Sequence, residues 1–125
     1  MILDTNALSA IANADSAITP AWTNAALIAI PVIVLGEYRY GIAQSRYRDQ
    51  YETWLRTNLP SCLILNISQE TADHYALVRV ELRHSGKPIP ANDIWIAALC
   101  REHNLPILSR DRHFDQVSGL RRLSW

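Results

Sequence analysis

The sequence predicts an α/β fold, a three-layer α/β/α sandwich around a central, mainly parallel sheet. Short apolar runs typical of strands alternate with helical segments along the chain, which is the order expected of βαβ units. Such units bury their sheet on both faces. Of the 125 residues 49% are hydrophobic, far above a disordered composition. No linker or internal repeat interrupts the pattern, so we expect one domain, residues 1–125.

The first half of the chain follows this alternation. Asn6 is a preferred N-cap residue type and is expected to begin the first helix. Pro31 is expected to end the second strand, and Pro60 follows the end of the fourth helix. The elements predicted here are a strand at 1–3, helices at 7–12 and 21–25, a strand at 27–30, and helices at 33–44 and 46–58.

The second half carries clearer helix boundaries. Ser68 is expected to cap a long helix that Gly86 and Pro88 end. Asn92 or a neighbour is expected to cap the next helix, which is apolar nearly all round and must therefore be largely buried. The elements predicted here are a strand at 63–65, helices at 69–84 and 93–103, and strands at 106–108 and 120–123.

The charge balance does not by itself favour a nucleic-acid-binding protein. The chain has 12 Lys and Arg residues against 12 Asp and Glu residues, whereas nucleic-acid binders are usually basic. If four of the acids bind a metal, however, the other 8 face 12 basic residues. Lys87 is the only lysine among these, and arginine suits bidentate phosphate contacts.

The cysteines and the hydropathy pattern predict a cytoplasmic protein without a membrane segment. Cys62 and Cys100 lie in apolar segments and are expected to be reduced core residues. The first residues have no basic segment typical of a signal peptide. Residues 16–36 carry no charge, but their apolar part, 26–35, is too short to span a bilayer and contains Pro31.

Four carboxylates stand where predicted elements begin or end. Asp4 follows the first strand, Glu37 lies on the helix after the second strand, Asp93 opens an apolar helix, and Asp111 follows the strand at 106–108. Parallel sheets bind ligands beyond the carboxyl ends of their strands. We therefore expect these four side chains to meet at one edge of the sheet.

Each acid alone has an ordinary explanation. Asp4 is a common turn or cap residue, and Glu37 would pair with an arginine on a solvated helix. Asp93 favours a helix start by charge, and Asp111 would form a loop ion pair. Asp115 is a further acid, which we expect to be solvated or to support the site from outside it.

The four carboxylates indicate a metal site only as a group. Two carboxylates about 5 Å apart repel by roughly 3 kcal/mol at an effective dielectric constant near 20. Several such pairs would strain a small domain, so the site must bind protons or a cation. Oxygen ligands suit Mg²⁺ or Mn²⁺, which can activate water and stabilise the charge on a phosphodiester. His103 and His113 lack zinc-ligand spacing and are expected to be surface or satisfied core residues.

Four segments resemble the motifs of PIN-domain ribonucleases, in particular the VapC-type toxins of toxin–antitoxin pairs. They are residues 3–6 (LDTN), 35–41 (LGEYRYG), 89–98 (IPANDIWIAA) and 108–114 (LSRDRHF). The resemblance covers the whole chain. It implies a helix-flanked parallel sheet, a Mg²⁺- or Mn²⁺-dependent endoribonuclease, a homodimer, and a small cognate VapB-like antitoxin that blocks the site.

The resemblance also assigns roles to residues. It places the acidic site at Asp4, Glu37, Asp93 and Asp111, with Asn6 as a supporting polar residue. Ser109 stands where the family more often has threonine and keeps the hydroxyl. In the expected mechanism, three aspartates hold the metal, and Glu37 helps position the water that hydrolyses RNA. The arginines expected along the RNA are Arg39, Arg110 and Arg112.

Other functions stay open at this point. A phosphoacceptor receiver domain needs an acid beside Asp4 and a lysine after its last core strand, and the chain has neither. A phosphatase with an aspartate nucleophile needs a second aspartate where Asn6 stands. A housekeeping RNA-processing nuclease and a non-catalytic metal- or RNA-binding module remain possible. Trp22, Trp54 and Trp125 are large apolar groups for a small domain, and we expect them to contribute to a dimer interface.

Overall fold

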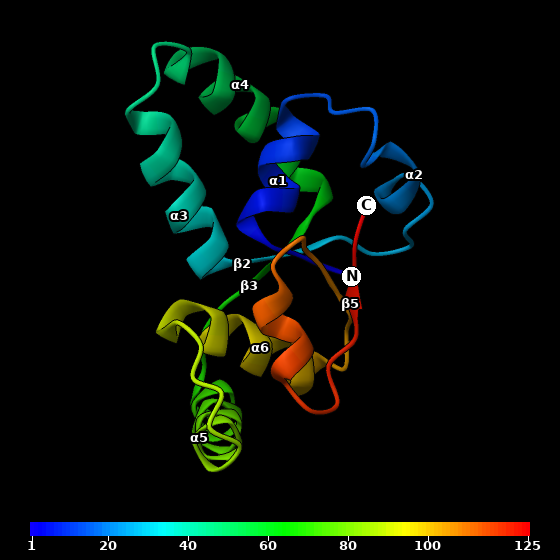
Figure 1. Ribbon diagram of the computed structural model, residues 1–125. Helices are drawn as coiled ribbons and strands as arrows, with labels where there is room; N and C mark the ends of the chain where they lie inside the picture. Colours follow the sequence, from blue (N-terminus) through cyan, green and yellow to red (C-terminus); the bar gives the residue numbers. More distant parts are fainter.

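A computed structural model describes residues 1–125 and confirms the α/β sandwich with a central parallel sheet (Figure 1). All strand pairs are parallel, and the strand order is β3-β2-β1-β4-β5. The strands are β1 (Ile2–Leu3), β2 (Ala29–Pro31), β3 (Leu63–Leu65), β4 (Ile107–Leu108) and β5 (Arg122–Leu123).

Helices cover the sheet on both sides. In Figure 1, α1, α3 and α4 gather above the sheet, and α5 and α6 lie below it. The helices are α1 (Thr5–Ala12), α2 (Thr19–Trp22), α3 (Val32–Ala43), α4 (Arg48–Asn58), α5 (Gln69–His84) and α6 (Ala91–His103), with two 3₁₀ helices, η1 (Leu59–Ser61) and η2 (Arg112–Gln116). Every predicted strand and helix is present, with boundaries shifted by a few residues.

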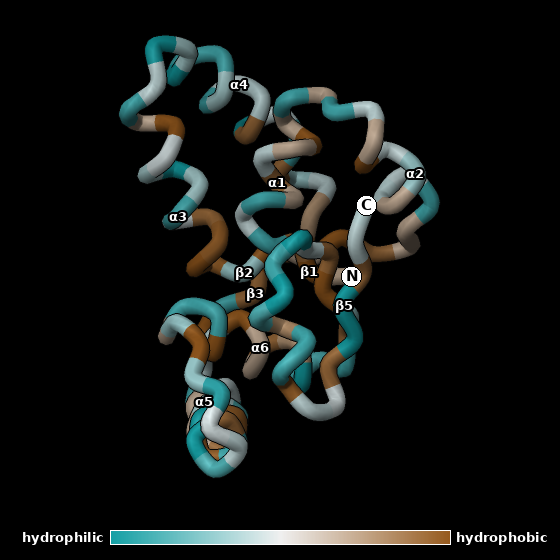
Figure 2. Tube along the Cα trace, in the orientation of Figure 1, coloured by the Kyte–Doolittle hydropathy of each residue, from teal (hydrophilic) through white to brown (hydrophobic).

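The core lies between the sheet and the helices. Figure 2 shows hydrophobic segments at the central strands and hydrophilic ones along α4 and the outer loops. Helix α6 is buried from Ile96 to Cys100, as its apolar sequence predicts. This helix therefore holds Asp93, in its first turn, in a fixed place relative to the sheet.

The pairing of β1 with β4 aligns the residues that matter for the site. Ile2 lies opposite Ile107, and Leu3 lies opposite Leu108. The backbone N–H of Asp4 donates to the carbonyl of Leu108 at 3.2 Å. The residues that leave the two strands, Asp4 and Ser109, therefore start from adjacent positions at the carboxyl edge of the sheet.

Two predicted helix caps are wrong. Asp4, not Asn6, is the N-cap of α1, because the chain turns into the helix immediately after β1 and the Asp4 carboxylate accepts the N–H of Thr5 at 2.8 Å. Asn6 consequently lies in the first turn. Pro90 is the N-cap of α6 and makes no side-chain cap hydrogen bond, so Asn92 lies in the first turn and is not the cap.

Proline also shifts the edges of two other elements. Pro20 lies in the first turn of α2, so this helix begins earlier than predicted. Pro31 was predicted to follow the second strand, but it is the last residue of β2. Ala29 donates its N–H to Met1, and residues two apart along a strand face the same neighbour. The missing N–H of Pro31 thus faces β1, which pairs with β2 only through Ile2 and Ala29.

The three tryptophans predicted to contribute to a dimer interface are half-buried. Trp22, Trp54 and Trp125 are partly buried and pack against the core. Trp22 and Trp54 line an apolar cavity of about 110 Å³ between the sheet and α1, α2 and α4. The homodimer remains a prediction that rests on the family resemblance. No helix combines the length and apolar character that crossing a bilayer would require.

We predict that Ile96→Ala lowers the free energy of unfolding by about 2–5 kcal/mol, because it leaves a cavity under α6. Ile96 is fully buried. Val80→Ala is the control, since the Val80 side chain on α5 is exposed and such a change costs within about 0.5 kcal/mol. Urea denaturation measures both. Equal losses in the two variants would show that α6 does not anchor the core.

Candidate active site

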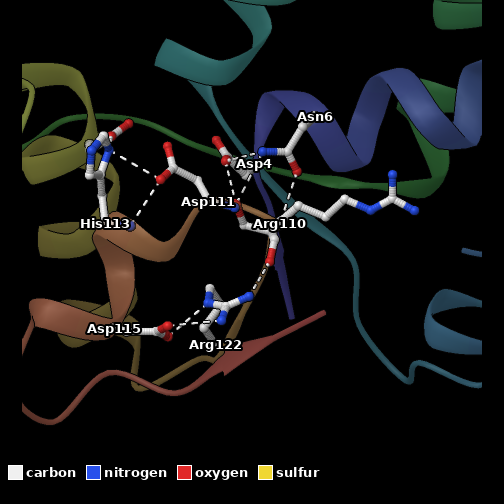
Figure 3. Close-up of polar contacts among 9 residues, drawn as sticks. Asp4, Asn6, Arg110, Asp111, His113, Asp115 and Arg122 are labelled. Atoms are coloured by element: carbon white, nitrogen blue, oxygen red, sulfur yellow. Dashed lines mark hydrogen bonds and ion pairs between the residues drawn. The ribbon is translucent and has the colours of Figure 1, made fainter. Parts of the chain in front are cut away.

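Asp4 is the centre of the polar cluster at the carboxyl edge of the sheet. It is only 5% exposed and accepts three hydrogen bonds, of which Figure 3 draws the one from Asn6. The donors are the backbone N–H of Thr5 at 2.8 Å, Nδ2 of Asn6 at 2.9 Å and Oγ of Ser109 at 2.6 Å. These contacts compensate the carboxylate for the water that it loses.

Burial raises the pKa of Asp4 above its ordinary value, because it disfavours the charged form. The hydrogen bonds from Ser109 and Thr5 act in the opposite direction, and the charges of Asp111 and Glu37 raise the pKa further. Asp111 and Glu37 are therefore close enough to Asp4 to act on its charge, as expected if the predicted acids lie together.

Glu37 connects three helices at this edge. It projects from α3 and accepts a hydrogen bond from Oγ1 of Thr5, on α1, at 2.6 Å. Its other oxygen accepts one from Nδ2 of Asn92, on α6, at 2.8 Å. Both donors hold the carboxylate in the site, and neither residue was singled out from the sequence for this role.

Asp93 and Asp111 meet at the ring of His113. Nδ1 of His113 lies 3.1 Å from Oδ2 of Asp93 and 3.1 Å from Oδ1 of Asp111, and Figure 3 shows the ring turned toward Asp111. Burial raises the pKa of Asp93, the hydrogen bond with His113 lowers it, and the charges of Asp111 and Asp4 raise it again.

The turn after β4 fixes Asp111. Its carboxylate caps η2 by accepting the backbone N–H of His113 at 2.9 Å. Its own N–H donates to Oγ of Ser109 at 2.9 Å, and the N–H of Arg110 donates to Oδ1 of Asn6 at 3.2 Å. Asn6 and Ser109 thus lie beside the acids, where supporting residues are expected.

Asp115 points away from this cluster. Arg122 on β5 donates to both of its carboxylate oxygens, at 2.7 and 2.8 Å, and also to the carbonyl of Ser109 at 3.0 Å (Figure 3). The hydrogen bond from Arg122 lowers the pKa of Asp115. Asp115 therefore lies outside the site and holds Arg122, which in turn contacts the carbonyl of Ser109 in the turn after β4.

The donor set suits a divalent cation. One oxygen each of Asp93 and Asp111 and a ring nitrogen of His113 all lie within 4.8 Å of one another. Carboxylate oxygens are typical ligands of Mg²⁺ and Mn²⁺. Burial and the charges of Asp111 and Asp4 raise the pKa of Asp93, and a nearby cation would favour its charged form.

His113 was expected to be a surface or satisfied core histidine, and its contact with the acids was missed. The signal lay in the spacing, because Asp111 precedes it by two residues at the start of a tight turn. Asn92 was weighed only as a cap, since its contact with Glu37 joins residues 55 positions apart. The contacts of His113 with Asp93 and of Asn92 with Glu37 join residues far apart in the sequence, so no local pattern indicates them.

Comparison with known proteins identifies the family. The family described as PIN domain matches residues 1–120. The chain belongs to the PIN-domain family. The predicted resemblance to its VapC-type ribonucleases is confirmed by "Ribonuclease VapC2" of Haemophilus influenzae, which is 32% identical over 82% of this chain and 78% of its own length.

Two further relatives cover nearly the whole chain. "tRNA(fMet)-specific endonuclease VapC" of Shigella flexneri is 27% identical over 99% of this chain and 96% of its own. In the crystal structure of VapBC2 from Rickettsia felis bound to a promoter DNA fragment, one chain superimposes with a TM-score of 0.86 at 28% identity. That match covers 99% of this PIN-domain chain and 97% of the other.

The first test of the site is electrostatic. Because the pKa of Asp4 is raised, the folded state holds its proton more tightly than the unfolded chain does. The tighter binding of this proton contributes to the free energy of unfolding. The contribution is fully present below the ordinary pKa of 3.8 and is lost as the pH rises through the pKa of the folded state. In EDTA, Asp4→Asn should therefore gain in melting temperature relative to wild type as the pH rises through this range.

Asp49→Asn is the matched control, since the side chain of Asp49 is 99% exposed. Its melting temperature should stay parallel to wild type over the same pH range. Adding a divalent cation at about 100 times its Kd should stabilise the wild type by roughly 2.7 kcal/mol and Asp4→Asn by less. A pH-independent difference between Asp4→Asn and wild type would contradict the electrostatic strain.

Proposed function

We propose that this PIN domain, as a single unit over residues 1–125, is a metal-dependent endoribonuclease that acts as the toxin of a toxin–antitoxin pair. The observation that carries the proposal is the meeting of Asp4, Glu37, Asp93 and Asp111 at the carboxyl edge of the sheet. PIN nucleases depend on divalent metal, and Asp93 and Asp111 lie, with His113, close enough to share one ion. We take the ion to be Mg²⁺ or Mn²⁺.

Each acid has a part in hydrolysis. Asp4, Asp93 and Asp111 would hold the cation, and Glu37, which accepts hydrogen bonds from Thr5 and Asn92, would orient the attacking water. When bound, the cation supplies Lewis-acid stabilisation of the charge on the phosphate and makes water easier to deprotonate. No side chain needs to act as a nucleophile.

Asn6 and Ser109 act through Asp4. Both donate to the same oxygen, Oδ2 of Asp4, at 2.9 and 2.6 Å. This leaves Oδ1 of Asp4 with a backbone donor only, that of Thr5. We infer that the pair sets the orientation of the Asp4 carboxylate in the metal site, in the way that hydrogen-bonded partners orient metal ligands generally.

The relatives support the biological role. VapC proteins are named ribonucleases, and the structural neighbours include VapBC toxin–antitoxin complexes from Rickettsia felis and Salmonella typhimurium. We propose an RNA substrate, a VapB-like antitoxin and a cytoplasmic location for this chain. A complete set of acids argues against a non-catalytic module. A housekeeping RNA-processing nuclease is the alternative that the experiments below separate.

The arginines expected along the RNA differ in availability. Arg39 pairs with Glu52 at 3.5 Å, and the guanidinium of Arg110 lies over the ring of Trp125, 4.5 Å from its centroid. Arg112 is exposed beside Asp111. Arg112 is therefore the arginine that we place nearest to an incoming phosphate, with Arg110 held on the aromatic ring close by.

RNA cleavage tests the enzymatic proposal. The purified protein should cut structured RNA in Mg²⁺ or Mn²⁺ and stop in EDTA. Asp93→Asn keeps the size of the side chain but removes its charge, so the cleavage rate should fall by on the order of a hundredfold or more. Asp49→Asn, which changes an acid outside the site, should cut at the wild-type rate. Wild-type cleavage by Asp93→Asn would show that another site or a contaminant is responsible.

Growth of a host cell tests the toxin role. Expression of the chain alone should arrest growth, whereas Asp4→Asn should not. A small partner encoded next to the gene should restore growth and copurify with the wild type. An arginine of that partner inserted among the acids would replace the cation through charge-assisted hydrogen bonds. Harmless expression of an RNA-cleaving wild type would favour the housekeeping nuclease.

A further inference from the structure

We propose that His113 is a ligand of the divalent cation, and that its imidazole makes the site prefer Mn²⁺ and later first-row ions over Mg²⁺. This inference rests on the proposed metal-dependent function and names the ion that the site selects. It adds a nitrogen donor to a set of acids that would otherwise offer oxygen alone.

The spacing of the donor atoms supports a shared ion. Nδ1 of His113 lies 3.1 Å from Oδ2 of Asp93 and 3.1 Å from Oδ1 of Asp111. Two ligands at right angles, each roughly 2.1 Å from one ion, are about 3 Å apart. The nitrogen therefore already stands at the distance of a neighbouring ligand from both carboxylates. All three donor atoms fall within 4.8 Å of one another.

The turn that carries His113 is fixed, while its ring is accessible. The backbone N–H of His113 donates to Asp111 at 2.9 Å, and the next residue, Phe114, is completely buried. The His113 side chain itself is 45% exposed. The main chain thus holds the ring at the rim of the cluster, where it reaches the acids and an ion can enter from solvent.

The chemistry of the imidazole decides the preference. Mg²⁺ binds oxygen ligands and keeps much of its water, whereas imidazole nitrogen suits transition metals. Affinity for nitrogen-containing sites rises from Mn²⁺ along the first row. A site of carboxylates plus His113 should therefore bind Mn²⁺ more tightly relative to Mg²⁺ than the same carboxylates alone.

A second role for His113 is as a counter-charge to the two acids, and it predicts the opposite result. A positive group beside the carboxylates competes with a cation, so its removal would strengthen the binding of both ions. A ligand does the reverse, because its removal weakens the ion that it prefers.

The experiment measures Mn²⁺ and Mg²⁺ binding to the protein without RNA. Calorimetry gives both affinities, and electron paramagnetic resonance of free Mn²⁺ checks the first. His113→Ala should weaken Mn²⁺ binding about tenfold and Mg²⁺ binding by less than about threefold, so that the ratio falls. His103→Ala is the control, since His103 is also a half-exposed histidine beside an acid, Glu102, at 3.7 Å, and should change neither affinity.

The other outcomes separate the two proposals. Unchanged or tighter Mn²⁺ binding by His113→Ala, or an equal loss for both ions, overturns the role of His113 while the metal site stands. A wild type that binds neither ion overturns the proposed function itself. If His113→Ala fails to fold, His113→Asn decides, because its amide keeps a polar group of similar reach but offers no imidazole, and a retained Mn²⁺ preference would then refute the proposal.

Discussion

A carboxylate buried at the end of the central strand is the constraint on which this structure depends. An unpaired charge in the position of Asp4 would be strongly unfavourable. The chain keeps it there by giving it Thr5, Asn6 and Ser109 as donors. Those donors come from α1 and from the end of β4, so satisfying one side chain also fixes how two distant segments meet.

Ser109 connects Asp4 to the turn after β4 and to β5. Its hydroxyl donates to Asp4 and accepts the N–H of Asp111, which links the buried acid to the exposed turn. Its carbonyl accepts a hydrogen bond from Arg122, which the two oxygens of Asp115 hold in place. The last strand thereby supports the geometry of the first, and an ion pair that is worth little for stability alone acquires a positioning role.

The sequence was sufficient to predict the features that depend on pattern. Alternating apolar and helical segments predicted the sheet, and acids at strand ends predicted which side chains meet, because parallel strands bring their carboxyl ends to one edge. The register of β1 against β4 then places Asp4 and Ser109 at adjacent positions. The resemblance to PIN-domain motifs supplied the roles of Asn6 and Ser109, which no periodicity indicates.

The features that the sequence could not predict are details of backbone geometry and contacts between side chains far apart in the chain. Asp4 caps α1 because it is the single residue between the end of β1 and the start of the helix. Residue preference alone predicted Asn6 as the cap, since it takes no account of this backbone geometry. Asn92 binds Glu37 because α3 and α6 pack together. Trp22 and Trp54 pack against the core and line an apolar cavity between the sheet and the helices above it.

The chain has no net charge because the acids of this site are counted together with the basic residues elsewhere. Without a cation, four carboxylates at one edge repel a phosphate, and within a Debye length of about 8 Å salt does not screen them fully. A bound divalent ion offsets part of this negative charge and offers the phosphate a positive centre, so cation and RNA would each favour the binding of the other. An arginine from a partner would offset part of the same charge without offering a Lewis acid. One acidic cluster would thus account for both the proposed activation by metal and the proposed inhibition by a basic side chain, without a second site or a change of fold.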